Sequence, residues 1–183
     1  MLVNVDDIAS VTNIDKLEEY EEAVAALVKA NRKTPTEVVT FDPSDMTGSS
    51  ITSSVTVGGF KIVGTSDKAV TLMNNGTTYT YNDTEYTTTK SLSMGGAATF
   101  GTTRYIEFTL TKKATVTIVA KSTSASADRI VKMVTTAKAE VATFAANGAQ
   151  SITTHEDIDA GTYQIGSAGS GVYIYAIIFE YFD

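Results

Sequence analysis

The segment AGTYQIGSAGSGVYIYAIIFEY, residues 160–181, decides the fold class, because it holds two strand-like runs that carry almost no charge. β-Branched and aromatic residues fill both runs, and Gly and Ser separate them. This pattern predicts a closing hairpin that seals the core of a β-sandwich, with residues 166–171 as its flexible hinge. We therefore expect the segment to hold the fold together and not to contact a ligand.

Similar runs recur from Ile51 onward. They are rich in Thr, Val, Ile, Tyr and Phe, and turn residues separate them at roughly the 8–12-residue spacing of sandwiches and barrels. RYIEFTL (104–110) and ATVTIVA (114–120) alternate cleanly, so each is expected to have one buried and one solvent-facing side. The pair Asn75-Gly76 predicts a type I′ hairpin. The sequence is thus mainly β, a β-sandwich (jelly roll) over residues 51–183.

An amphipathic helix is predicted over residues 12–33, TNIDKLEEYEEAVAALVKANRK. Apolar residues at three- and four-residue spacing form one stripe on it. Acidic residues crowd its first half and basic residues its end, which complements the helix dipole, and Pro35 then ends it. The residues of the stripe are Ile14, Leu17, Val24, Leu27 and Val28.

Residues 34–50, TPTEVVTFDPSDMTGSS, contain both prolines of the chain and several turn residues. They predict a linker over 35–50 with one short strand at 38–41. The expected organisation is therefore a helix unit (1–34), a linker (35–50) and a sandwich (51–183). The apolar stripe has two interpretations: it packs onto the sandwich, or it self-associates or docks into a larger assembly.

Composition argues against several classes of partner. Of 183 residues, 43% are apolar and 19% charged, which is typical of a globular protein. The net charge of −7 argues against nucleic acids and anionic membranes as partners. No run is long enough for a membrane-spanning helix, and the start MLVNVDDIAS lacks the basic and apolar regions of a signal peptide. We expect synthesis in the cytosol without a signal peptide.

The order of the β segments resembles a known group of modules. The most specific parts are KSLSMGG (90–96), the alternating strands around Phe108 and Val116, and the Gly-Thr-Tyr strand that leads into Gly-Val-Tyr-Ile-Tyr. Over about residues 51–181 they resemble the β-jelly-roll carbohydrate-binding modules associated with pectate lyases, which have a galactose-binding-like sandwich. The resemblance implies a sandwich fold and a carbohydrate-binding role.

Ligand-binding candidates are aromatic and basic residues in the β region. Flat rings stack on sugar faces, and a cation binds the carboxylate of an acidic sugar. The alternative for the tyrosines is a place in or at the edge of the core, and for the cations a solvated surface. The candidates are Tyr79, Tyr81, Tyr86, Lys90, Arg104 and Arg129.

The segment THEDID, residues 154–159, is the one candidate for a metal site. His155, Asp157 and Asp159 would supply ligands to Ca²⁺, and a polar turn is the favoured alternative. The Gly-rich stretch at 93–101 lacks the spacing of a phosphate-binding loop. We expect no catalytic residues and no cofactor.

These observations predict a non-enzymatic structural or adhesion protein. The combination of an anchoring helix and an outward-facing sandwich suggests a bacteriophage virion component, a head decoration or head-fibre protein, on the virion surface. Its predicted partners are other virion proteins, such as capsid proteins, through the helix, further copies of itself, and glycans. The alternative is a carbohydrate-binding module of a polysaccharide-degrading system, secreted or at the cell surface.

Overall fold

The computed structural model describes residues 20, 21, 23, 24 and 34–182. The chain divides into two compact units, Met1–Thr34 and Pro35–Asp183. Within the predicted helix, residues 20, 21, 23 and 24 have helical geometry, and Val24 is 54% exposed. The other stripe positions, Ile14, Leu17, Leu27 and Val28, lie outside the described residues, so the helix stays a prediction. No helix among the described residues is long and apolar enough to span a membrane.

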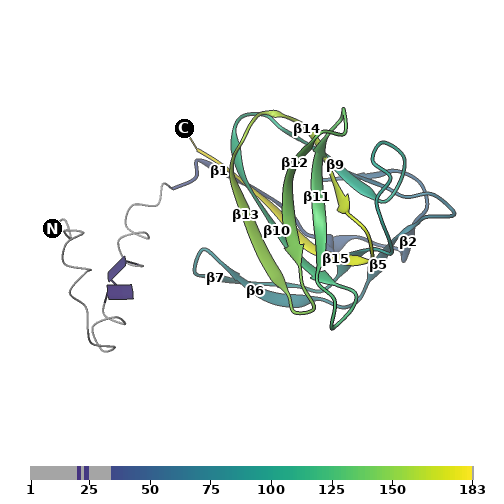
Figure 1. Ribbon diagram of the computed structural model, residues 1–183, viewed down its shortest axis with the longest axis horizontal. Coiled ribbons are helices and arrows are strands. Elements are labelled where there is room, and N and C mark those ends of the chain that lie inside the picture. Colours follow the sequence, from purple (N-terminus) through teal and green to yellow (C-terminus); the bar gives the residue numbers. More distant parts are fainter. Residues whose placement is uncertain (1–19, 22, 25–33, 183) are drawn as a thin grey trace. The chain divides into compact units, whose positions relative to one another are not determined.

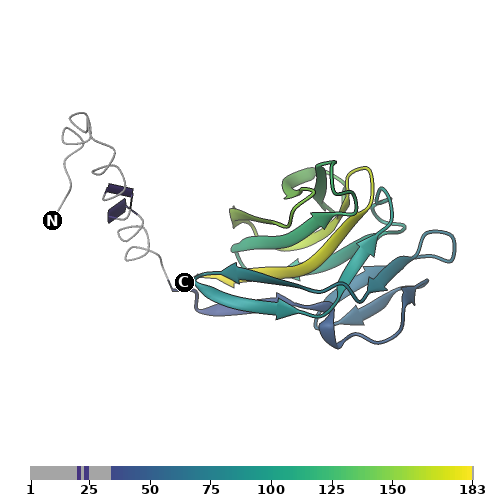
Figure 2. The same ribbon diagram turned by 90° about the horizontal axis from the view of Figure 1, so that it is seen from below.

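The second unit is a β-sandwich, as predicted, built from two antiparallel sheets and a separate two-stranded hairpin (Figures 1 and 2). Its elements are β1 (Glu37–Phe41), the 3₁₀ turn η2 (Pro43–Asp45), β2 (Ser50–Ile51), β3 (Val55–Val57), β4 (Phe60–Val63), β5 (Val70–Met73), β6 (Thr77–Tyr81), β7 (Thr84–Thr88), β8 (Ser91–Met94), β9 (Tyr105–Leu110), β10 (Ala114–Ser122), β11 (Arg129–Thr135), β12 (Glu140–Ala146), β13 (Ser151–Ile158), β14 (Gly161–Ser167) and β15 (Val172–Tyr181).

The chain passes repeatedly between the two sheets. The seven-stranded sheet has the order β13-β10-β15-β8-β5-β2, with β1 also paired to β15, and the six-stranded sheet has the order β12-β11-β14-β9-β4-β3. The predicted closing hairpin at residues 160–181 is therefore wrong: β14 and β15 lie in different sheets. The turn between them, AGSG (168–171), carries the chain across the sandwich, and each strand lies inside its own sheet, bonded on both sides.

An aromatic cluster fills the space between the sheets. Phe179 of β15 packs against Phe108 of β9 with ring centroids 4.6 Å apart, and against Phe60 of β4 at 5.2 Å. All three side chains are at most 3% exposed. Burying an aromatic side chain of this size stabilises the fold by about 2–3 kcal/mol. The inner faces of both sheets are thus committed to the core.

The short strand predicted at 38–41 is confirmed as β1, but the rest of the segment predicted as a linker differs from that expectation. β1 pairs with β15 in register from Glu37 opposite Tyr181 to Phe41 opposite Ile177. Phe41 is 2% exposed and packs on Phe60, and Met46 is also part of the core. The two prolines do not prevent this, because Pro35 precedes the strand and Pro43 begins the 3₁₀ turn after it. Residues 35–50 therefore belong to the sandwich.

The predicted hairpin turn at Asn75-Gly76 is also wrong. β5, before this pair, belongs to the seven-stranded sheet, whereas β6, after it, belongs to the hairpin. Gly76 is needed for a different reason: a Cβ there would lie 1.9 Å from the carbonyl oxygen of Thr88. The two-residue hairpin turn is instead Asn82-Asp83, where both residues have positive φ, as a type I′ turn requires.

Candidate functional site

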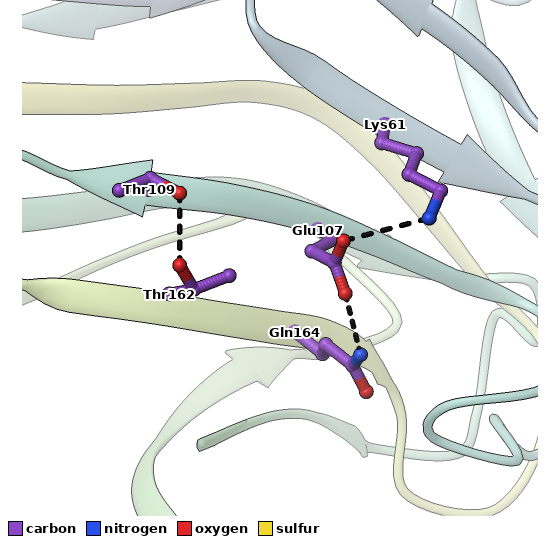
Figure 3. A network of polar contacts seen from close by, with 5 residues as sticks. All are labelled: Lys61, Glu107, Thr109, Thr162 and Gln164. Carbon is purple, nitrogen blue, oxygen red and sulfur yellow. Dashed lines mark hydrogen bonds and ion pairs between the residues drawn. The ribbon is translucent and has the colours of Figure 1, made fainter. Parts of the chain in front are cut away.

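A row of polar side chains crosses the outer face of the six-stranded sheet. Strand register places Lys61 of β4 opposite Glu107 of β9, and Glu107 opposite Gln164 of β14. Residues that are directly opposite in neighbouring strands point to the same face, so the three side chains stand side by side (Figure 3). The chain neighbours of these three residues point to the inner face and belong to the core, so the side chains of the row point outward.

Glu107 is held from both sides. Gln164 Nε2 donates a hydrogen bond to Glu107 Oε2 at 2.7 Å, and Lys61 Nζ lies 3.6 Å from Glu107 Oε1 (Figure 3). The Lys61 and Glu107 side chains are 45% and 24% exposed, so both remain within reach of a ligand. The ion pair is long and partly solvated and contributes little stability. The arrangement therefore fixes a carboxylate beside an ammonium group on rigid strands.

The amide of Gln164 is unusual. The residue is 4% exposed, and its Oε1 is buried without a hydrogen-bond partner among the described residues. An unsatisfied buried acceptor costs about 1–3 kcal/mol. A buried acceptor of this kind calls for an explanation, such as a bound water, an ion or a ligand, so we take Gln164 as a candidate site residue.

Two further features border the row. Thr109 and Thr162, the next outward pair on β9 and β14, share a hydrogen bond between their hydroxyls at 2.9 Å (Figure 3). Tyr105, two residues before Glu107, presents its ring to the same face. Burial raises the pKa of the Tyr105 hydroxyl, Glu107 raises it further and Lys61 opposes both, so this hydroxyl stays protonated and can donate a hydrogen bond.

The loop between β8 and β9, residues 95–104, covers one end of this face. A Cβ at Gly166 of β14 would lie 2.5 Å from Ala98 Cβ and 2.7 Å from the Arg104 carbonyl oxygen, with Phe100 3.6 Å away. Ala98 also donates its backbone N–H to Ser167 at 2.9 Å. Gly166 is two residues after Gln164, so the loop forms a wall beside the polar row.

The predicted tyrosines lie in a different place. Tyr79 and Tyr81 of β6 are 5% and 8% exposed and pack onto the outer face of the seven-stranded sheet, in one cluster with Tyr175 of β15. Burial, Asp42 and Tyr86 together raise the pKa of Tyr79 to about 12. Tyr86 of β7 is 41% exposed and stacks on Tyr79 with ring centroids 5.4 Å apart. Of these three tyrosines, only Tyr86 presents a ring to solvent.

The three predicted cations contact loops. Lys90 Nζ donates to the Met46 carbonyl oxygen at 2.5 Å. Arg129 Nη1 donates to Thr123 Oγ1 at 2.5 Å and also to the Gly171 carbonyl oxygen. Lys90 and Arg129 thus contact different parts of the chain, and Arg104 lies against Gly96. The structure therefore does not gather the cations into one anion site, and their role in ligand binding stays a prediction.

The candidate calcium ligands also have other contacts. His155 Nε2 lies 2.7 Å from the Thr143 carbonyl oxygen and therefore carries the proton that it donates. Lys113 Nζ lies 3.7 Å from a carboxylate oxygen of both Asp157 and Asp159. Among the described residues, no group of three or more His, Asp or Glu side chains could hold a metal ion. Positions 154–158 are strand rather than turn.

Sequence reasoning missed Lys61, Glu107 and Gln164. The alternation in RYIEFTL did indicate that Glu107 faces solvent, and this was the one signal in the sequence. Gln164 lies 57 residues further along the chain, and only the pairing of β9 with β14 brings it to Glu107. Such pairing depends on sheet topology, which the local pattern does not specify.

Comparison with known proteins finds likenesses among solved structures, of which two are described here. No protein-family model and no curated protein matches the chain. One similar structure is the CBM22-1 xylan-binding domain of Xyn10C from Paenibacillus barcinonensis, with 11% identity and a TM-score of 0.41, over 83% of this chain and 99% of that one. Another is isomalto-dextranase from Arthrobacter globiformis T6 with panose, with 10% identity and a TM-score of 0.35, over 81% of this chain and 33% of that one. At such low scores neither likeness assigns a function.

Proposed function

We propose that this protein is a non-enzymatic adhesion and display protein whose sandwich binds neutral glycans on the outer face of the six-stranded sheet. The observation that supports this most is Glu107, whose carboxylate is held by Gln164 and Lys61 on three neighbouring strands. Because the strands are rigid, little side-chain freedom would be lost on binding.

The chemistry of the row suits a sugar. A carboxylate accepts hydrogen bonds from two neighbouring hydroxyls, and an ammonium group donates to a hydroxyl oxygen. Hydrogen bonds to charged groups are worth about 1.5–3 kcal/mol each, more than neutral ones. Glu107 and Lys61 together would therefore recognise a vicinal diol, the group that distinguishes carbohydrates from most other ligands. The hydroxyls of Thr109 and Thr162 would extend the contact along the strands.

A neutral glycan fits this face better than an acidic one. Lys61 is the single cation of the row, and Glu107 already pairs with it. The chain carries a net charge of −7, so a polyanion would be repelled at long range. A catalytic role would need a second carboxylate across a bound sugar, or a comparable partner. The row of Lys61, Glu107 and Gln164 holds one carboxylate, which favours binding over catalysis.

The wider role that we propose is display on a bacteriophage virion, as a head decoration or head-fibre protein. Support comes from the division of the chain at Thr34 and Pro35 into an N-terminal unit and the sandwich. The first unit would anchor the protein to capsid proteins or to further copies of itself, and many weak sites would then act together. A carbohydrate-binding module of a polysaccharide-degrading system remains the alternative.

Affinity gel electrophoresis of the full-length protein tests glycan binding. The gels contain soluble xylan, mixed-linkage β-glucan, galactan or dextran, with polygalacturonate as the acidic comparison. We expect at least one neutral polysaccharide to retard the protein and polygalacturonate not to. Glu107→Gln should weaken binding by about 10-fold or more, since it removes a charged hydrogen-bond acceptor. Retardation by none of the neutral polysaccharides would refute the proposal.

The control variant is Glu156→Gln, which removes the same charge from an exposed position on β13. It should bind as the unchanged protein does. If both variants bind equally well, the outer face of the six-stranded sheet is not the binding site. The anchoring role is tested separately: light scattering compares the mass of the full chain with that of a chain that starts at Pro35. An oligomer that becomes a monomer would support an assembling role for residues 1–34, and two monomers would remove it.

A further inference from the structure

Strand β7, residues Thr84–Thr88, is bonded on one side only. It pairs with β6 and with no other strand of the described chain (Figure 1). The first four of its five residues are exposed, and the ring of Tyr86 is 41% exposed. The hairpin itself is fixed: Tyr79 and Tyr81 pack onto the seven-stranded sheet, and Asn82 donates to Glu180 Oε1 at 2.6 Å. β7 is thus a held strand with an open edge.

The register of the hairpin shows which backbone groups face outward. In a hairpin with a two-residue turn, the pair next to the turn is hydrogen-bonded and the pairs alternate from there. Tyr81 with Thr84 and Tyr79 with Tyr86 therefore use their backbone groups inside the hairpin. Glu85 and Thr87 direct their backbone N–H and C=O groups away from β6. Among the described residues, these groups have no main-chain partner on that outer side.

This edge has little protection. Native edge strands are shielded by short length, charged side chains, proline, a bulge or a covering segment. β7, with the sequence TEYTT, has five residues, one charged side chain, Glu85, and no proline or lysine, and its pairing with β6 is uninterrupted. Its threonines and tyrosine favour extended structure. An edge of this kind is a template for a further strand.

We propose that β7 pairs with β7 of a second copy of this chain, about a two-fold axis at Tyr86. An antiparallel pair centred on Tyr86 places Glu85 opposite Thr87 of the second copy, and Thr87 opposite its Glu85. These are the residues whose backbone groups point outward, so two residues on each chain exchange four hydrogen bonds. No carboxylate then stands opposite another, whereas a shift that paired Glu85 with Glu85 would be repulsive.

The same register gives the exposed tyrosine a partner. Tyr86 stacks on Tyr79 at 5.4 Å with ring planes 16° apart. In the two-fold pair the two Tyr86 residues are a non-hydrogen-bonded pair, in which side chains approach most closely. Four tyrosine rings would then run across the joined hairpins, and aromatic pairs add about 0.5–1.5 kcal/mol each. One short strand makes a small interface, so the pairing gains strength where copies are held close together.

Disulfide trapping in the full-length chain tests this pairing. The chain contains no cysteine, so Tyr86→Cys introduces a single thiol. The two-fold axis places this thiol beside the same thiol of the second copy. The control is Thr56→Cys on β3, an exposed edge strand of the six-stranded sheet. Under mild oxidation, disulfide-linked dimer should form on the order of 10-fold faster with Tyr86→Cys, because pairing raises the local thiol concentration. Equal rates would overturn the proposal, even if residues 1–34 oligomerise.

A proline substitution distinguishes pairing through the β7 backbone from chance contact between two copies. Thr87→Pro, added to Tyr86→Cys, removes an outward N–H and leaves the hydrogen bonds between β6 and β7 in place. It should reduce the rate of cross-linking to that of the Thr56→Cys control. Thr56→Pro is the matched change, because Thr56 also directs its N–H outward from β3, and it should leave cross-linking by Tyr86→Cys unchanged. Rapid cross-linking that survives Thr87→Pro would contradict pairing through the β7 backbone.

Discussion

The two sheets of the sandwich have similar inner faces and very different outer faces. On the seven-stranded sheet, the β6–β7 hairpin covers an apolar outer surface that includes Val119 and Ile178, which are at most 2% exposed. On the six-stranded sheet, the outer surface carries the row of Lys61, Glu107 and Gln164, partly open to solvent. Covered apolar area stabilises the fold, whereas a solvated polar row adds little. The difference indicates that the first face serves stability and the second is available for binding.

The largest effect is expected beneath the hairpin. Tyr175 of β15 is 4% exposed and belongs to the cluster that Tyr79 and Tyr81 complete. Tyr175→Ala should lower the free energy of unfolding by about 3–5 kcal/mol, as truncation of large buried aromatic residues does. Urea unfolding followed by circular dichroism measures it. A loss below about 1 kcal/mol would mean that the hairpin does not depend on this face.

The next effect lies where a loop covers the open sheet. Gly166→Ala would bring a methyl group against Ala98 and the Arg104 carbonyl, and should cost about 1–3 kcal/mol. The matched control is Gly169→Ala, since a Cβ at Gly169 meets nothing within 4 Å. Thermal unfolding of the two variants should separate them clearly. Equal stabilities would show that the 95–104 loop is not pressed onto β14.

The covered face should also respond to alkaline pH. Burial raises the pKa of Tyr79 from 10.0 to about 12, so the folded state favours the protonated phenol more than the unfolded state does. Stability from this residue is complete below pH 10 and is lost as the pH rises towards 12. Unfolding measured across this range should show the decline, and Tyr79→Phe should make it shallower. An identical slope in the variant would contradict the assignment to Tyr79.

The smallest effect compares two threonine pairs of equal length. Thr117 and Thr154 on the seven-stranded sheet, and Thr109 and Thr162 on the six-stranded sheet, each share a hydroxyl hydrogen bond of 2.9 Å. Thr117 is fully buried, so Thr117→Ala should cost about 1–1.5 kcal/mol. Thr109→Ala, at an exposed position, should cost about 0.5 kcal/mol or less. A reversed order in urea unfolding would remove the distinction between the faces.

The sequence predicted the class of fold because alternation and turn residues are local signals. It predicted the faces of RYIEFTL, where Glu107 does face solvent, but not those of ATVTIVA, which lies in β10 and is buried on both faces because other elements cover both sides of its sheet. It did not predict which strands become neighbours. The turn after β14 could equally have made a hairpin or a crossing, and only the packing of two sheets around Phe108 and Phe179 decides between them.

The candidate site was missed for the same reason. Tyrosines are natural candidates for stacking on sugars, but their exposure depends on whether another element covers the face that they occupy. Tyr79 and Tyr81 are buried because the hairpin turns over onto the seven-stranded sheet. Glu107 and Gln164 become a site only through the register of β9 and β14. The local pattern therefore predicted which way these side chains point, but not which residues lie beside them.

The most direct test of the account is a map of where a glycan binds. Isotope-labelled full-length protein is titrated with a soluble oligosaccharide from the neutral polysaccharide that retards it most, and amide chemical shifts are recorded. The account predicts that the largest changes fall on the outer face of the six-stranded sheet, around Lys61, Glu107 and Gln164. Changes centred instead on the β6–β7 hairpin around Tyr86, with the polar row unaffected, would contradict it.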